Sequence, residues 1–122
     1  MKRVLLVEDH AAFQEALTTL LNMEPDLEVV GRAGSLAEAR AAAAMEEVDV
    51  AVVDAFLPDG NGVELVRELR RADPRVSIMM LTGRVDPELH ALAFEAGADE
   101  VCVKAAGIAE IIKAIRGIVD AR

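Results

Sequence analysis

Short apolar runs alternate five times along this chain with segments whose apolar residues recur at helical spacing. The predicted strands cover residues 3–7, 27–33, 48–54, 77–82 and 100–103, and a helical pattern follows each of them. Such alternation is typical of a parallel sheet with helices on both faces. Because crossovers between parallel strands are right-handed, we expect a doubly wound α/β domain with the flavodoxin-like strand order 2-1-3-4-5.

Capping and turn residues indicate where several helices begin and end. Ser35, with Glu38 three residues later, predicts a capping box at the start of an alanine-rich helix. Asp86 followed by Pro87 predicts another helix start, and Gly97 predicts the end of the same helix. These signals support the helices that a parallel sheet requires between its strands.

Length and charge limit the class of protein. A chain of 122 residues is long enough to bury one core, so we expect residues 1–122 to form a single domain. The net charge of −9, with no basic stripe, argues against direct nucleic-acid binding by this domain. No signal peptide and no apolar run near the ~18 residues of a membrane span are found, so we expect a cytoplasmic protein without membrane contact. The one cysteine, Cys102, is expected to be a buried, inert thiol.

Polar residues suited to phosphate or metal chemistry follow four of the five predicted strands. Glu8 and Asp9 follow the first strand, Asp54 ends the third, Thr82 ends the fourth and Lys104 follows the fifth. The carboxyl ends of parallel strands meet at one edge of the sheet, where open α/β folds bind ligands. In the predicted order the first and third strands are neighbours, so the three acidic residues should converge there.

Three carboxylates in one place repel each other unless a cation shares them. Mg²⁺ suits such a site, because it prefers hard oxygen ligands and keeps waters that a phosphate can replace. Asp54 is predicted to accept a phosphoryl group as an acyl phosphate, with Lys104 and Thr82 contacting the phosphoryl oxygens. Each residue alone is more often a cap or a solvated side chain, but the combination in this order favours a site.

With these residues in place, the chain resembles the receiver domain of two-component response regulators over essentially all of residues 3–120. Residues 6–9 are similar to the family's metal-binding acidic pair, and residues 53–62 to its phosphoacceptor loop. Leu81-Thr82-Gly83 and 103–104 complete the family's set of five functional residues.

By that resemblance, Asp54 takes a phosphoryl group from the histidine of a sensor kinase. The family's Mg²⁺ ligands correspond to Glu8, Asp9, Asp54 and the backbone carbonyl of Phe56. Phosphorylation would pull Thr82 inward and reshape a surface of the fourth and fifth helices, where a homodimer or a partner would form. The resemblance thus implies a phosphoacceptor switch and not an enzyme.

Several short motifs resemble one branch of the family in particular, whose members usually carry a helix-turn-helix DNA-binding domain; no such domain lies within the 122 residues. The chain also departs from the family at two positions. Val101 stands where the family commonly has Tyr or Phe, so we expect a switch without an aromatic rotor. Ala105 stands where many relatives have proline, and a cis bond before it costs about 3–4 kcal/mol.

Three other functions share part of the pattern. A phosphatase of the haloacid dehalogenase kind needs a second aspartate two residues after the first, where this chain has Phe56. A dinucleotide-binding domain needs G-x-G-x-x-G after its first strand, where residues 8–10 are Glu-Asp-His. A receiver-like interaction module without phosphorylation control is suggested by Val101, but the five intact residues argue against it.

Three further residues allow two interpretations each. His10 is either a metal ligand or base, or a loop histidine with an ordinary hydrogen bond, which we favour. Asp59 is either a fourth acid near the metal or, as its neighbours Pro58 and Gly60 favour, a turn former. Phe94 falls off the apolar stripe of its helix, and we place it beside a loop in preference to an exposed contact surface.

Overall fold

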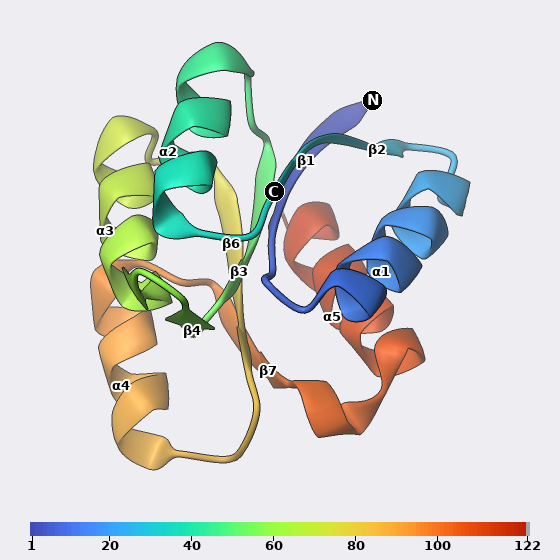
Figure 1. The fold of residues 1–122 in the computed structure, drawn as a ribbon. Coiled ribbons are helices and arrows are strands. Elements are labelled where there is room, and N and C mark those ends of the chain that lie inside the picture. The colour runs from blue at the N-terminus through green and yellow to red at the C-terminus, as the bar shows by residue number, and fades with distance from the viewer. Residues whose placement is uncertain (122) are drawn as a thin grey trace.

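The computed structural model describes residues 1–121 and contains a five-stranded parallel sheet between two layers of helices (Figure 1). The strands of this sheet are β1 (Lys2–Val7), β2 (Leu27–Ala33), β3 (Val50–Asp54), β6 (Ser77–Thr82) and β7 (Glu100–Val103). They lie in the order β2-β1-β3-β6-β7. The predicted fold class and strand order are therefore confirmed.

Within residues 1–121, five α-helices and three short elements accompany the strands of the sheet. The helices are α1 (Ala11–Met23), α2 (Leu36–Met45), α3 (Gly62–Ala72), α4 (Pro87–Ala96) and α5 (Ile108–Asp120). A small antiparallel hairpin follows β3, formed by β4 (Phe56–Leu57) and β5 (Gly60–Asn61). One 3-10 turn, η1 (Lys104–Ala106), follows β7.

The side chains of the sheet alternate between two apolar cores. Val4 and Leu6 of β1 pack with α1 and α5, whereas Leu5 and Val7 pack with α2, α3 and α4. Figure 1 shows these two groups of helices on opposite sides of the sheet. Successive side chains of a strand point to opposite faces, so a central strand between two helical layers must be apolar throughout.

The third strand of the sheet begins at Val50, two residues later than predicted. The reason lies in Asp49, whose N–H donates to the carbonyl of Arg3 at 2.8 Å. The Asp49 carboxylate in turn accepts a hydrogen bond from the N–H of Arg3 at 2.8 Å. Because a side chain takes this bond, regular strand pairing starts only after it.

The predicted helix ends are present, but one capping hydrogen bond has a different partner from the one expected. The Ser35 hydroxyl accepts a hydrogen bond from the Glu38 N–H, but the Glu38 carboxylate accepts from Gly34 and not from Ser35. Asp86 caps α4 through two N–H groups, and Gly97 ends that helix with a φ of 118°. A glycine suits this left-handed conformation.

Two side chains are more exposed than expected. Phe94 is 47% exposed, because the buried face of α4 is already occupied by Leu89, Ala93 and Ala96. The favoured position beside a loop was therefore wrong. Cys102 is half-buried, and burial raises the pKa of its thiol. Within residues 1–121, no helix is long and apolar enough to cross a membrane.

Arg70 fastens α3 to the segment between α4 and β7. Its guanidinium donates to the carbonyls of Pro74, Val76 and Gly97 at 2.7–3.1 Å and to the Asp99 carboxylate at 3.0 Å. Because the substitution Arg70→Met removes all of these hydrogen bonds and the ion pair with Asp99 at once, we expect it to lower the free energy of unfolding by about 2–4 kcal/mol.

Urea unfolding of this variant checks the prediction. Arg71→Met is the matched control, because Arg71 is exposed on the same helix. A loss for Arg70→Met no larger than that of the control would show that the network adds little to stability.

Candidate functional site

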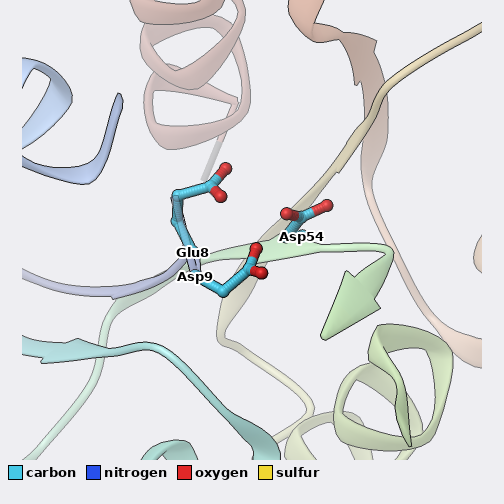
Figure 2. Close-up of side chains that lie close together, drawn as sticks. All are labelled: Glu8, Asp9 and Asp54. Atoms are coloured by element: carbon cyan, nitrogen blue, oxygen red, sulfur yellow. The ribbon is translucent and has the colours of Figure 1, made fainter. Parts of the chain in front are cut away.

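The predicted acidic residues converge at the carboxyl edge of the sheet. Glu8 and Asp9 follow β1, Asp54 ends β3, and these strands pair with Val7 beside Val53. Figure 2 shows the three carboxylates facing a common space, and one oxygen of each lies within 4.8 Å of the others. Glu8 and Asp54 are buried, whereas Asp9 is exposed. This acidic group could hold a metal ion.

Lys104 lies against the two buried carboxylates. Its Nζ is 2.6 Å from Glu8 Oε1 and 2.9 Å from Asp54 Oδ2. The same ammonium lies 5.2 Å from the ring centroid of Phe13 on α1, within the range of a cation–π contact. The sequence did not predict this contact, because Phe13 and Lys104 are far apart in the chain and belong to different elements. No cis peptide bond occurs in residues 1–121, so the bond from Lys104 to Ala105 is trans.

Burial and hydrogen bonding shift the pKa values of Glu8 and Lys104 in opposite directions. Burial raises the pKa of Glu8, although hydrogen bonds from Lys104 and from the His10 N–H oppose the rise. For Lys104, burial is likewise the unfavourable influence, but hydrogen bonds to Glu8 and Asp54 outweigh it and raise the pKa of the ammonium. The lysine therefore stays positively charged, and its one ammonium contacts two buried carboxylates.

The segment after Asp54 turns back on itself within a few residues. The Gly62 N–H donates to the Ala55 carbonyl at 2.8 Å, and an added Cβ at Gly62 would lie only 2.1 Å from the Asp54 carbonyl oxygen. Only glycine fits so close to the backbone. Phe56 lies between them in β4, with its side chain 60% exposed. Its N–H is 3.4 Å from Asp54 Oδ1, which is a long hydrogen bond.

Thr82 reaches the same edge, but its hydroxyl is bonded elsewhere. It is buried at the end of β6, where Leu81 pairs with Asp54. The Thr82 hydroxyl donates to the Arg84 carbonyl and accepts from the Arg84 N–H. Thr82 is thus tied to the start of the β6–α4 loop.

The two ambiguous loop residues serve as helix caps. His10 Nδ1 accepts a hydrogen bond from the Phe13 N–H at 3.3 Å, so the favoured interpretation as an ordinary loop histidine is confirmed. Asp59 lies in the turn between β4 and β5, as favoured, and its side chain has a second role that was not predicted. Its carboxylate accepts from the N–H groups of Leu36 and Ala37, at the start of a helix far from it in sequence.

Residues 4–116 match the response regulator receiver domain family. The chain belongs to this family. The receiver domain is 41% identical over 118 residues to DevR/DosR, a DNA-binding transcriptional activator of Mycobacterium tuberculosis; the match covers 97% of this chain and 54% of that protein. The chain thus spans about half the length of the curated relatives it matches.

Solved structures give the same result. A two-component response regulator of the LuxR family from Aurantimonas sp. SI85-9A1 matches with a TM-score of 0.89 and 32% identity, over 98% of this chain and 86% of that one. The receiver domain of NtrC4, solved as a beryllofluoride-activated dimer, matches with a TM-score of 0.88 and 26% identity, over 99% and 98%. The family resemblance inferred from the sequence is therefore confirmed.

Membership settles the competing functions. Response regulators act in two-component phosphorelays as signalling switches, which excludes a haloacid dehalogenase-like phosphatase and a dinucleotide-binding domain. The relatives are regulators under phosphorylation control, so the interaction module without such control is not favoured.

Proposed function

We propose that this chain is a phosphoacceptor switch in which Asp54 takes a phosphoryl group from the histidine of a sensor kinase. The observation that carries the proposal is the position of the Asp54 carboxylate, buried between the Lys104 ammonium and the acidic pair at 8–9. A carboxylate held beside a fixed cation can attack phosphorus while charge on the transferred group is neutralised. We also propose that residues 1–122 form one receiver domain.

The residues present fit a divalent cation. Three carboxylates lie within 4.8 Å of one another, and the exposed Asp9 leaves the group open to a hydrated ion. We propose that Glu8, Asp9, Asp54 and the backbone carbonyl of Phe56 hold Mg²⁺, which would neutralise phosphoryl oxygens when bound.

The transfer itself involves few side chains. A carboxylate oxygen of Asp54 forms a bond to phosphorus as the bond from phosphorus to the donor's histidine nitrogen breaks. Lys104, which already contacts Asp54 Oδ2, then pairs with an oxygen of the new acyl phosphate. The nearby Phe13 ring holds the ammonium close to the position where this charge appears.

Switching would follow from a change of partner at Thr82. In this structure its hydroxyl donates to the Arg84 carbonyl, and a phosphoryl oxygen on Asp54 would compete for the same donor. If the Thr82 hydroxyl gave up its hydrogen bonds to Arg84, the β6–α4 loop would be released. Val85 in this loop is 72% exposed. Val101 is half-buried and too short to rotate as an aromatic would, so the change reaches α4 and α5 through packing. A phosphoryl group biases such an equilibrium only by its different contacts in the two states.

Beryllofluoride with Mg²⁺, which mimics the phosphoryl group, tests this proposal. We expect amide chemical shifts to change not only around Asp54 but also through residues 84–96 and 100–119. In Thr82→Ala the distant changes should shrink, because the hydroxyl that couples the site to the loop is gone. Changes confined to the pocket loops in the wild type would mean that the site binds phosphate without signalling.

Asp9→Ala tests the metal site. Mg²⁺ should raise the melting temperature of the wild type by mass action, and we expect this rise to disappear in the variant. The metal-free variant should be no less stable, because one of three repelling carboxylates is removed. Glu15→Ala is the control, since Glu15 is an exposed acid on α1 and its loss changes the net charge equally. An unchanged Mg²⁺ response in Asp9→Ala would exclude the acidic pair as the site.

The relatives support a proposal about the partners of this domain. DevR/DosR is a DNA-binding transcriptional activator, and NtrC4 was solved as an activated receiver dimer. We propose that this domain likewise controls a transcription regulator, with a homodimer or a partner docking on α4 and α5. The absence of direct nucleic-acid binding by this domain and a cytoplasmic location stay predictions.

A further inference from the structure

We propose that Asp59 is a positioning residue for the phosphoacceptor loop: its carboxylate holds residues 55–61 on the N-terminus of α2, and metal affinity at the acidic group depends on this attachment. The inference rests on the function proposed above. It concerns a residue outside the acidic group of Glu8, Asp9 and Asp54, and the sequence did not predict that its carboxylate attaches the loop to α2.

The attachment consists of two hydrogen bonds across a long stretch of chain. Asp59 Oδ1 accepts from the Leu36 N–H at 2.7 Å, and Oδ2 accepts from the Ala37 N–H at 3.0 Å. The Ser35 hydroxyl accepts from the next N–H, that of Glu38, at 3.1 Å. The first three N–H groups of α2 are thus all paired, two of them by a residue of the phosphoacceptor loop. The same two bonds lower the pKa of Asp59, as expected for a carboxylate accepting backbone donors.

A close contact next to Asp59 joins the same two elements. An added Cβ at Gly60 would lie 2.6 Å from Leu36 Cδ1, so the hairpin backbone packs directly on the first turn of α2. The hairpin itself is short, with only Phe56 paired to Asn61 and Leu57 to Gly60. So short a ladder is weak support by itself, and its position depends on what holds it from outside.

The loop carries a group that needs accurate placement. The Phe56 carbonyl is the proposed backbone ligand of Mg²⁺, three residues before Asp59 in the chain. The Phe56 side chain is 60% exposed and provides little anchoring, so the carbonyl is positioned by the hairpin backbone. Mg²⁺ tolerates little deviation from octahedral geometry, and a loosened hairpin should weaken binding.

Mg²⁺ binding and the Asp59 hydrogen bonds should be thermodynamically coupled, so each can be measured through its effect on the other. If the Asp59 bonds favour the metal-binding geometry, then Mg²⁺ must strengthen those bonds by the same free energy. The amide protons of Leu36 and Ala37 should therefore exchange more slowly with Mg²⁺ than without it. No metal ligand lies on α2, so a change there reports the attachment.

The experiment compares Asp59→Ala and Asp59→Asn with Ser35→Ala. All three weaken the capping of the first turn of α2, but only the two substitutions of Asp59 also weaken the attachment of the loop. Mg²⁺ titrations followed by amide chemical shifts measure the affinity for Mg²⁺. We expect Asp59→Ala to weaken this affinity about threefold to tenfold, a small effect for a residue that supports a metal ligand without binding the metal. Asp59→Asn keeps one acceptor oxygen and should fall between Asp59→Ala and the wild type. Ser35→Ala should stay within about twofold of the wild type, since its cap is independent of the loop.

The outcomes separate this inference from the proposed function. Slower exchange at Leu36 and Ala37 with Mg²⁺ in the wild type and Ser35→Ala, lost in Asp59→Ala, would support the inference. Equal Mg²⁺ affinities in Asp59→Ala and Ser35→Ala would overturn it while leaving the proposed function intact. A wild type that binds neither Mg²⁺ nor beryllofluoride would instead contradict the proposed function.

Discussion

Asp54→Asn should gain no mass when incubated with acetyl phosphate and Mg²⁺, whereas the wild type should gain the mass of one phosphoryl group. The substitution preserves the shape of the side chain but replaces a nucleophilic carboxylate by a neutral amide, which does not form an acyl phosphate. Asp54 is buried at the end of β3, so a side chain of equal size leaves the packing there undisturbed. Intact-protein mass spectrometry measures the difference directly.

A matched control distinguishes this loss from general effects of removing an acid. Asp120→Asn changes an exposed aspartate on α5 and should take up phosphate as the wild type does. Modification that survives in Asp54→Asn would assign the acceptor to another residue. Loss of modification in both variants would show that net charge, not the acceptor carboxylate, governs the reaction.

Lys104→Met should destabilise the metal-free protein by about 3 kcal/mol, because it leaves two buried carboxylates without their cation. The Glu8 side chain is fully buried, that of Asp54 is 6% exposed and that of Lys104 is 25% exposed, so solvent screens this group weakly. Methionine keeps most of the aliphatic stem and its packing near Phe13. The loss should therefore come mainly from the ammonium.

The same variant should respond more strongly to Mg²⁺ than the wild type. Lys104 contacts oxygens of Glu8 and Asp54, which are proposed metal ligands, and its charge repels a cation at the same place. Urea unfolding with and without Mg²⁺ measures both effects. Lys113→Met on the exposed side of α5 is the control. A smaller Mg²⁺ stabilisation in Lys104→Met than in the wild type would mean that the lysine assists metal binding.

The strand order and the acidic cluster could be predicted from local pattern alone. Runs such as 50–53 and 78–81 are apolar at every position, and only a strand covered on both faces buries such a run. Right-handed crossovers then leave few strand orders, and all of them bring the carboxyl ends to one edge. Glu8, Asp9 and Asp54 converge for that reason, whatever their rotamers. The strand start at Val50 escaped prediction because the carboxylate of Asp49 replaces a ladder bond.

Contacts between distant elements were decided only by the tertiary structure. The sequence contains both Phe13 and Lys104, but nothing local places the ring near the ammonium. Asp59 reads as a turn former, yet its carboxylate pairs with α2, and the Thr82 hydroxyl binds Arg84 in preference to Asp54. The physical reason is that buried or helix-terminal donors and acceptors must all be paired. Which partner each side chain takes depends on the groups that the fold brings near it. Spacing along the sequence does not determine these long-range partners.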